Sequence, residues 1–488
     1  MSPSTSTRSS LPVPTFESIG VRTLINCQGT YTILTGSRAL NTVVAAMAEA
    51  TNNYVHMDDL MDKVGQRLAE LTGAEWGYIS SGCAAALAEI TAACIAGADP
   101  ERMTRLPDTT GMKNQVIMLR GHRNAYDRAI RMTGAQIVEV VTEADLQAAI
   151  HDQTALVAIT GDMAQPDHLP VERMIAIARE HGIPCLVDAA AERPLVPNPY
   201  LQMGADAVTY SGGKCLRGPQ ASGLALGRKD LLWAAFLNAA PHHGLCRPMK
   251  AGKEEIMGLL AAVEAWVLGR DQEAEWRMWE GYLATIQQAI QAIPSVSTTI
   301  EQPGIANVAP TMRITWDPAT LRVTPTHIHR ELLEGEPAIT CHLLADGLRI
   351  MTYMMEDGDD AIVAKRLSAL LAAERPPLVI PATESPAVDV SGEWAVELRY
   401  VLDSSTHAIS LTQDGATLRG NYRARYERVP VEGQVQGQSV SFSAAIGYQA
   451  NKLRYRFTGT ANEDGTMGGE VDLGEYGTAQ WSARRVSQ

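Results

Sequence analysis

The chain has 488 residues, of which 45% are hydrophobic and 20% are charged, and its formal net charge is −14 at pH 7. This length and composition predict a globular protein of about three domain-sized units with a large buried core. The acidic balance disfavours a nucleic-acid partner, because negative charge repels phosphate backbones and no run of basic residues offsets it. No apolar run is long enough to span a membrane, so no membrane contact is expected.

Seven cysteines are scattered along the chain without metal-ligand spacing, and several stand in apolar runs. Their odd number and spacing do not suggest a disulfide framework or a metal site. Reduced, mostly buried thiols are typical of a cytoplasmic enzyme. Residues 1–14 are rich in Ser, Thr and Pro and lack the apolar core of a signal peptide, so they are expected to form a disordered tail.

Two helical segments are predicted at residues 41–50 and 57–71. The strand and helix that follow them form the first unit that could bind a ligand. Residues 76–79 predict a strand, and the segment Ser80-Ser81-Gly82-Cys83 leads into an alanine-rich helix at 84–96. Small residues at a helix start leave backbone N–H groups free to bind an anion, and the two serines add hydroxyl donors. The same segment also fits an ordinary helix cap.

Strands and helices then alternate along the chain. Strands are predicted at residues 115–119, 136–140, 155–160 and 184–187, and helices at 143–150 and 171–181. This rhythm predicts a mostly parallel sheet with helices on both of its faces.

The strand at 184–187 ends in Asp188, which is followed by three alanines. A carboxylate at the end of a buried strand is costly unless a cation meets it. A protonated pyridine nitrogen is such a cation, and the alanines leave room for a flat ring.

Lys214 stands between two predicted strands, residues 207–210 and 222–226, after the turn Ser211-Gly212-Gly213. A poorly solvated lysine favours its neutral amine, which can condense with an aldehyde. A lone lysine in such a place is more often a surface residue of a hairpin loop. Because one βα step separates Asp188 from Lys214, both are expected at the same edge of the sheet.

Together these motifs resemble the pyridoxal-phosphate (PLP) enzymes of fold type I. The segments YSGGKCLRGPQASG, VDAAAE, INCQGTYTILTGS and TGAEWGYISSGCAAAL are similar to the branch that contains bacterial selenocysteine synthase, and within it to D-glucosaminate-6-phosphate ammonia-lyase-like proteins. The resemblance covers roughly residues 15–375. It implies PLP bound as an imine to Lys214, with Asp188 at the ring nitrogen and His122 stacked on the ring.

The resemblance also implies contacts for other residues. Cofactor contacts are expected for Ser80, Ser81, Gly82, Cys83, His122, Asp162, Gln165, Asp188, Ala190, Ser211 and Lys214. Substrate contacts are expected for Arg349, Arg217, Thr30 and Tyr31. Ordinary alternatives stay open: His122 as a solvent-exposed loop residue, Asp162 as a turn acid before proline, and Arg349 in a surface ion pair.

The predicted secondary structure changes twice in the carboxyl-side part of the chain. Helices are predicted at residues 229–239 and along a long stretch at 254–293. They complete a predicted amino-terminal arm and large domain at 15–293. A small α+β domain is predicted at 294–374. Residues 375–390 are proline-rich and predict a linker. Eight period-2 runs follow, starting near residues 392, 406, 417, 429, 439, 452, 466 and 477. They predict an up-and-down, lipocalin-like β-barrel at 391–488.

The expected fold is therefore an α/β, PLP-dependent aminotransferase-like fold followed by an antiparallel β-barrel. The expected function is a lyase that performs α,β-elimination on a β-hydroxy amino acid or amino-sugar acid, with Lys214 as general base and acid. An aldolase, a racemase, a β-carbon transferase and a non-enzymatic PLP-binding sensor remain alternatives. The resemblance implies a homodimer or a larger homo-oligomer, whereas the acidic charge argues against tRNA binding.

Overall fold

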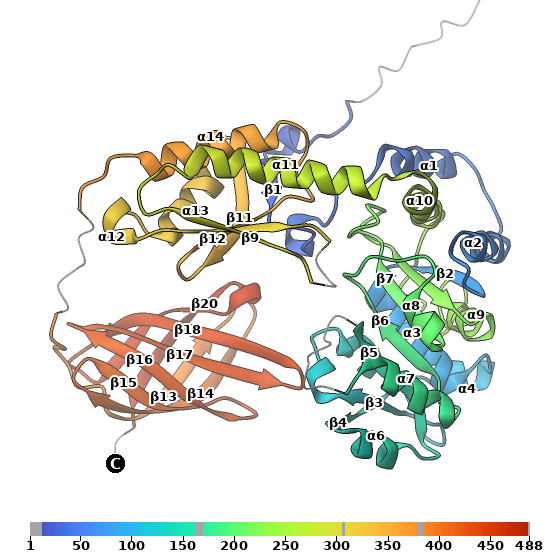
Figure 1. Cartoon of the computed structure of the whole chain (residues 1–488). Helices are drawn as coiled ribbons and strands as arrows, with labels where there is room; N and C mark the ends of the chain where they lie inside the picture. Colours follow the sequence, from blue (N-terminus) through green and yellow to red (C-terminus); the bar gives the residue numbers. More distant parts are fainter. Residues whose placement is uncertain (1–11, 162–168, 305–307, 378–383, 487–488) are drawn as a thin grey trace, which may run out of the picture. The chain divides into compact units, whose positions relative to one another are not determined.

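The computed structural model describes residues 12–161, 169–304, 308–377 and 384–486 of the chain. Its contacts divide the chain into two compact units, Met1–Leu378 and Val379–Gln488 (Figure 1). The second unit has an apolar core of its own. Asp162 and Gln165, which are predicted to contact the cofactor, lie outside the described residues.

The first unit is centred on a seven-stranded sheet with strand order β2-β8-β7-β6-β5-β3-β4. The strands are β2 (Trp76–Ser80), β3 (Gln115–Leu119), β4 (Gln136–Val140), β5 (Thr154–Thr160), β6 (Cys185–Asp188), β7 (Ala207–Ser211) and β8 (Gly223–Gly227). All run in the same direction except β8, which is antiparallel to both β2 and β7. The central strands are continuous apolar runs because helices cover both faces of the sheet.

The helices around this sheet are short to medium in length. They are α1 (Asn41–Thr51), α2 (Met57–Thr72), α3 (Cys83–Ala96), α4 (Pro100–Arg105), α5 (Asp127–Arg131), α6 (Glu143–Ala149), α7 (Val171–Glu180), α8 (Pro199–Met203), α9 (Lys229–Leu237) and α10 (Lys253–Glu264). Helix α3 is buried nearly all round, which its alanine-rich sequence permits. The predicted α/β class, with strands and helices alternating along the chain, is confirmed.

The prediction of one long helix at 254–293 is wrong, because this stretch forms two helices. Helix α10 ends in a π-turn, Ala265–Gly269, and α11 (Gln272–Ile290) begins afresh. Asp271 caps the new helix, since its carboxylate accepts the backbone N–H of Ala274 at 2.9 Å. The break lets Arg270 turn toward the loop that carries Lys214, where its guanidinium reaches the carbonyl of Cys215.

A second sheet of the first unit has five strands in the order β1-β11-β12-β10-β9. They are β1 (Leu24–Cys27), β9 (Ser297–Glu301), β10 (Thr311–Thr315), β11 (Ala338–Leu344) and β12 (Gly347–Met351), and the helices of this part are α11, α12 (Pro318–Leu321), α13 (Pro325–Glu334) and α14 (Asp359–Ala372). Strand β1 comes from the amino-terminal arm and pairs in parallel with β11. The arm is thereby fixed beside residues more than 300 positions away in sequence, such as Thr340, whose hydroxyl donates to Gln28.

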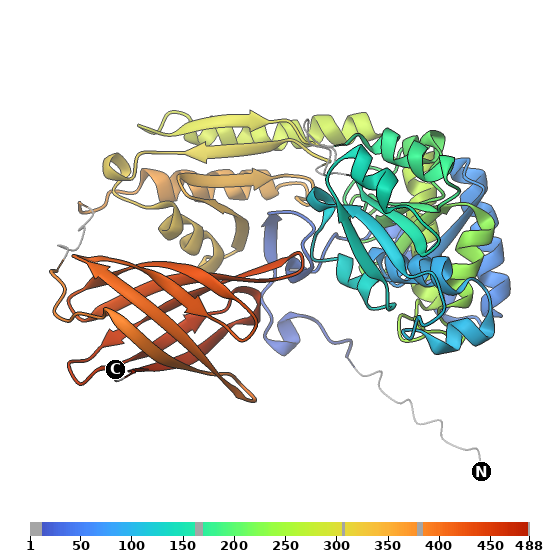
Figure 2. The same cartoon turned by 90° about the horizontal axis from the view of Figure 1, so that it is seen from below.

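The second unit is a closed barrel of eight antiparallel strands, each paired with its neighbour in sequence and with β13 paired to β20 (Figure 2). The strands are β13 (Gly392–Arg399), β14 (Ser404–Asp414), β15 (Thr417–Arg423), β16 (Arg428–Gln436), β17 (Ser439–Tyr448), β18 (Asn451–Ala461), β19 (Thr466–Asp472) and β20 (Thr478–Arg485). Alternate side chains point inward, as the period-2 pattern requires. The predicted barrel is confirmed.

Candidate active site

Asp188 and Lys214 lie at one edge of the seven-stranded sheet. Asp188 is the last residue of β6, where its Cα pairs with that of Thr209 on the parallel neighbour β7. Lys214 lies three residues beyond the end of β7, in a turn that precedes β8. The predicted meeting of these two residues at one edge follows from this parallel pairing.

The carboxyl group of Asp188 is held in an enclosed polar setting. Its Oδ1 accepts the backbone N–H of Ala190 at 3.1 Å and the thiol of Cys83 at 3.5 Å. Burial raises the pKa of Asp188, and the Ala190 N–H, the Cys83 thiol and the Lys214 charge oppose that rise. A buried carboxyl group with fixed orientation is a suitable partner for a cationic ring nitrogen, so Asp188 fits the predicted cofactor.

The start of α3 lies beside the Lys214 turn, because Gly223 of β8 pairs with both Ser80 and Ser211. A Cβ on Gly223 would stand 2.4 Å from the carbonyl carbon of Gly82 and 2.5 Å from the nitrogen of Cys83. The strand therefore approaches the helix start as closely as glycine allows.

No side chain of the described residues caps α3 at Gly82, so its first N–H groups are available to an anion. The hydroxyl of Ser80, by contrast, donates to the carbonyl of Gly82 at 2.8 Å. Ser80 thus supports the backbone of the turn, while Ser81 is only half-buried. The helix start fits a cofactor phosphate through its backbone more directly than through the Ser80 hydroxyl.

His122 is fully buried at the end of the short helix η3 (Arg120–His122) that follows β3. Its Nδ1 accepts the backbone N–H of Thr160 at 3.4 Å, and its carbonyl accepts the Thr160 hydroxyl at 3.0 Å. Asn124 donates to the same hydroxyl at 3.2 Å, and both Asn124 and Thr160 line a small pocket with Asp188. His122 is therefore held next to the Asp188 pocket, and its stacking role stays a prediction.

The amino-terminal arm binds the Lys214 turn through its backbone. The N–H of Ser37 donates to the carbonyl of Gly213 at 3.0 Å, and the N–H of Leu40 donates to the carbonyl of Arg217 at 3.1 Å. Farther back in the arm, the Thr30 hydroxyl bonds the Tyr353 hydroxyl, whereas Tyr31 is half exposed and packs edge-on against His342.

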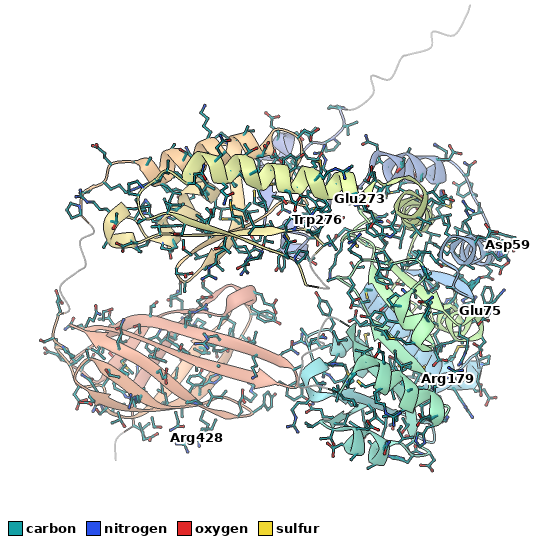
Figure 3. The ribbon with its side chains drawn as sticks, viewed as in Figure 1. Asp59, Glu75, Arg179, Glu273, Trp276 and Arg428 are labelled. Carbon is teal, nitrogen blue, oxygen red and sulfur yellow. The ribbon has the colours of Figure 1, made fainter. Side chains whose placement is uncertain are left out.

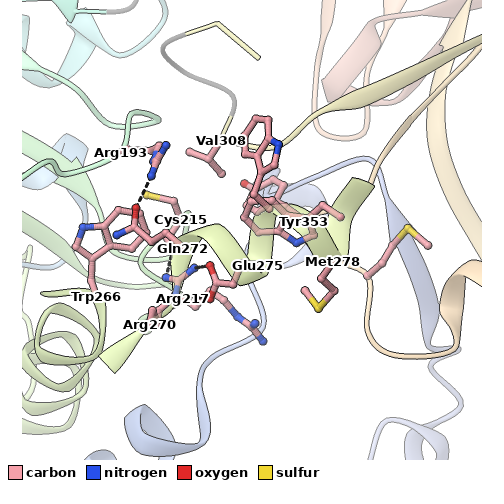
Figure 4. Close-up of a pocket in the computed structure, with 13 residues that line it drawn as sticks. Arg193, Cys215, Arg217, Trp266, Arg270, Gln272, Glu275, Met278, Val308 and Tyr353 are labelled. Atoms are coloured by element: carbon pink, nitrogen blue, oxygen red, sulfur yellow. Dashed lines mark hydrogen bonds and ion pairs between the residues drawn. The ribbon is translucent and has the colours of Figure 1, made fainter. Parts of the chain in front are cut away.

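A pocket rich in arginine adjoins the Lys214 turn (Figure 4). Cys215, the residue after Lys214, lines it, together with Arg193, Arg217 and Arg270. Aromatic side chains complete the lining, among them Trp266, Trp276, Trp279 and Tyr353. Glu273 and Trp276, labelled in Figure 3, lie near the start of α11.

Each arginine of this pocket is held by oxygen acceptors. Arg270 donates to both carboxylate oxygens of Glu275 at 2.8 Å and to the Cys215 carbonyl at 2.6 Å, and it lies 4.8 Å from the centre of the Trp266 ring. Arg193 donates to Gln272. Arg217 bonds the Arg38 carbonyl at 2.9 Å and Glu356 at 3.3 Å, and burial lowers the pKa of its guanidinium. These fixed cations can receive an anionic group.

Arg349 does not line this pocket. It lies on β12 opposite Arg313, and its Nε donates to Glu301 at 3.0 Å. This contact is the surface ion pair that the sequence left open as an alternative. Its role in binding a substrate carboxylate stays a prediction.

The sequence did not point to Arg193, Arg270, Trp266 or Tyr353. Arg270 was hidden inside the long predicted helix, although the segment Gly269-Arg270-Asp271 contains a helix-ending glycine and a capping aspartate. Arg193 directly follows the VDAAAE segment, and Trp266 lies in the same long predicted helix as Arg270. Tyr353 comes from a segment that carries no motif, and only the fold brings it to Cys215. Among the described residues, no group of three His, Cys, Asp or Glu side chains is placed to hold a metal ion.

Comparison with known proteins agrees with this geometry. The family model of the Cys/Met metabolism PLP-dependent enzymes matches residues 29–228. D-glucosaminate-6-phosphate ammonia lyase of Salmonella typhimurium is 34% identical over 366 residues, which cover 72% of this chain and 96% of that protein. The chain belongs to this PLP-dependent family.

Other members of the family show how far the likeness extends. A 5'-C-glycyluridine monooxygenase-decarboxylase of a Streptomyces species is 31% identical over 373 residues, covering 73% of this chain and 92% of its own. An L-seryl-tRNA(Sec) selenium transferase of Proteus mirabilis is 29% identical over 229 residues, covering 40% of this chain and 48% of its own. The solved structure of a D-glucosaminate-6-phosphate ammonia-lyase has a TM-score of 0.65 at 31% identity and covers 74% of this chain and 99% of its own.

These matches confirm the predicted family, its fold type I architecture and PLP as its cofactor. The chain is a PLP-dependent enzyme of the lyase type that acts on amino acid-like substrates. In the part of the chain that the structure describes, no helix combines the length and the apolar character needed to cross a bilayer.

Proposed function

We propose that the enzyme eliminates water across the α- and β-carbons of a β-hydroxy amino acid or amino-sugar acid, and that the unsaturated product hydrolyses to a 2-oxo acid and ammonia. The observation that carries the proposal is Lys214 at the same sheet edge as the buried carboxyl group of Asp188. The likeness to an ammonia lyase over almost the whole of that protein supports the reaction class.

The residues at the sheet edge have separate roles in the proposed reaction. PLP, when bound, withdraws electrons from the α-carbon of the amino substrate. Asp188 keeps the ring nitrogen protonated, and Ala190 and Cys83 hold its Oδ1 in place. Lys214 removes the α-proton and then delivers a proton to the departing β-hydroxyl. His122 and the start of α3 orient the ring and the phosphate.

The arginine pocket selects the substrate's acidic end. Arg217 and Arg270 line the pocket together with Cys215, the residue after Lys214, so an anionic group bound there would lie beside the Lys214 turn. Glu275 and Glu356 hold these arginines in the absence of substrate, and a carboxylate or phosphate can replace either partner. Thr30 and Tyr31 of the arm and Arg349 of β12 are the other proposed substrate contacts.

Two proposals concern the assembly and the compartment. We expect a homodimer or a larger homo-oligomer, because large apolar side chains are exposed along the arm, on α1 and in the connection after it, including Phe16, Ile33, Val44 and Tyr54. We place the enzyme in the cytoplasm, since all seven cysteines are free thiols.

The test is a product analysis with the full chain and bound PLP. A panel of β-hydroxy amino acids and amino-sugar acids, with and without a terminal phosphate, should yield 2-oxo acid and ammonia in equal amounts. Lys214→Ala should abolish turnover and the borohydride-trapped cofactor adduct. Release of glycine with an aldehyde, or exchange of the α-proton without elimination, would replace the proposed reaction by an aldolase or a racemase.

Substitution of arginines separates the two proposed acid-binding positions. Arg217→Met should raise KM for the acidic substrate by about tenfold and change kcat less, because it removes one charged contact. Arg349→Met gives the same result only if β12 binds the substrate. Arg313→Met is the matched control, since Arg313 pairs with the exposed Asp346 on the same sheet and should leave KM unchanged.

A further inference from the structure

Cys83 connects two parts of the candidate site. It is the first residue of α3, and its backbone N–H is one of those that no side chain caps at the helix start. Its Sγ lies 3.5 Å from Oδ1 of Asp188 and 3.3 Å from Oγ1 of Thr209. These two residues pair across β6 and β7. The same residue therefore offers a backbone donor at the helix start and a side chain to the buried acid.

The Cys83 thiol keeps its proton. Its residue is only 8% exposed, and burial, followed by the charge of Asp188, raises the pKa of the thiol well above its ordinary value. One thiol carries one proton, and two acceptors lie within its reach. The Thr209 hydroxyl has an acceptor of its own in the carbonyl of Val187 at 3.4 Å. A carboxylate is the stronger acceptor, so the thiol proton is directed at Asp188.

Asp188 depends on donors to stay ionised in its buried position. Burial raises the pKa of this carboxyl group, and the Ala190 N–H, the Cys83 thiol and the Lys214 charge oppose the rise. Ala190 contributes through its backbone, so Cys83 provides the one side-chain hydrogen bond to the carboxyl group within the described ranges. Both donors bind Oδ1, which leaves Oδ2 for the ring nitrogen of the cofactor.

The other ionisable side chains around Asp188 do not replace the thiol. Tyr126 and Asp127 line the small pocket that Asp188 shares, and Asp127 is paired with two arginines. His122 is held beside this pocket by Thr160. None of these three donates to the Asp188 carboxyl group in the part of the chain that the structure describes.

We propose that Cys83 is a positioning residue whose thiol keeps Asp188 ionised and directs its charge at the ring nitrogen of the cofactor. Loss of the donor would make the carboxyl group more basic, so that it would take a larger share of the proton between itself and the ring nitrogen. Electron withdrawal from the substrate would then be weaker. The inference rests on the role of Asp188 under the proposed function, and it extends that role to the start of α3.

The experiment is a pH titration of the visible absorbance of the full-length, PLP-loaded protein. A positive charge on the ring nitrogen lowers the midpoint of this titration, because it disfavours a second positive charge on the same conjugated system. Asp188→Asn is the reference variant and should move the midpoint to higher pH. Cys83→Ala should move it in the same direction by about 0.5 pH unit, the size expected for one lost hydrogen bond.

Three further variants separate hydrogen bonding from packing. Cys83→Ser keeps a donor and should return the midpoint most of the way to that of the parent. Cys83→Val lacks a donor but fills the space of the thiol, so it should behave like Cys83→Ala. Cys94→Ala is the matched control, because Cys94 is the other cysteine of α3 and has Asp206 and Arg228 as charged neighbours; the midpoint should not change. Thermal unfolding of the apoproteins checks that each variant folds.

The possible results are distinct. A shift in Cys83→Ala and Cys83→Val that is reversed in Cys83→Ser supports the proposal. Weaker PLP binding by Cys83→Ala at an unchanged midpoint would show that Cys83 only packs the helix start, and this overturns the proposal. An equal shift in Cys83→Ser or in Cys94→Ala also overturns it. An unchanged midpoint in Asp188→Asn would instead remove Asp188 from the ring nitrogen, and the proposed function would lose that assignment.

Discussion

Glu89 is a fully buried acid on α3, the helix whose start adjoins the Lys214 turn. Burial raises its pKa to about 8, and the nearby Tyr78 hydroxyl only partly opposes that rise. The group therefore keeps its proton in the folded enzyme at neutral pH, whereas it ionises near its ordinary value when the chain unfolds. Ionisation of the unfolded state removes stability as pH rises from about 4.5 toward 8.

Glu89→Gln should remove this pH dependence. In the parent, the Glu89 carboxyl should lower the free energy of unfolding of the first unit by about 2 kcal/mol between pH 6 and 8, because a raised pKa costs up to about 1.4 kcal/mol per pH unit. This decrease should be absent in the variant. Denaturant unfolding at a series of pH values measures the slope. Glu49→Gln, an exposed change on α1, is the control, and an unchanged slope in Glu89→Gln would contradict the assigned pKa.

At the scale of single residues, the sequence predicted the positions of those site residues that lie at the ends of strands. Asp188 and Lys214 follow short apolar runs, so their place at the sheet edge could be derived before the structure. The contact of Cys83 with Asp188 could not, because it depends on how closely α3 approaches β6 and β7. Arg270 was missed because the apolar periodicity of 254–293 conceals the helix break that sets its direction, although Gly269 and Asp271 mark that break.

At the scale of elements, the approach of β8 to α3 is the feature that shapes the phosphate end of the site. Gly223→Ala should displace the start of α3, because the new Cβ would stand 2.4 Å from the carbonyl carbon of Gly82 and 2.5 Å from the nitrogen of Cys83. Both of these atoms belong to the backbone and cannot rotate away as a side chain could. We expect PLP affinity to fall by at least about tenfold, measured by fluorescence titration of the apoenzyme.

Gly281→Ala is the matched control for this substitution. Gly281 lies inside α11 with open space around its Cβ position, so alanine there should stabilise the helix by about 0.5–1 kcal/mol and leave PLP affinity unchanged. Equal PLP affinity in Gly223→Ala and the parent would show that β8 does not set the position of the α3 start.

The elements themselves were predictable to different degrees. All eight barrel strands begin within two residues of the predicted positions, because inward apolar and outward polar residues alternate between clear turn signals. The small sheet was harder, since β1 lies in the arm and pairs with β11 across more than 300 residues of sequence. Local patterns carry no record of such a pairing.

At the scale of the whole molecule, the exposed apolar side chains are unevenly distributed. Ten of the large ones lie between residues 13 and 55: Val13, Phe16, Ile19, Val21, Leu24, Tyr31, Ile33, Val44, Tyr54 and Val55. This stretch is less than a tenth of the chain. Helix α1 adds to it, because Val43 is its one fully buried residue. A surface of this kind is typical of an interface with a second copy of the chain.

Polar substitutions on this surface should separate the subunits. Val44→Asp combined with Tyr54→Ser removes two exposed apolar side chains without touching the buried Val43, so the fold should remain while the assembly dissociates to monomers. Light scattering coupled to size exclusion measures the mass. Leu268→Asp, an exposed site on the π-turn after α10, is the control and should keep the parent mass. A double variant of unchanged mass would show that the interface lies elsewhere.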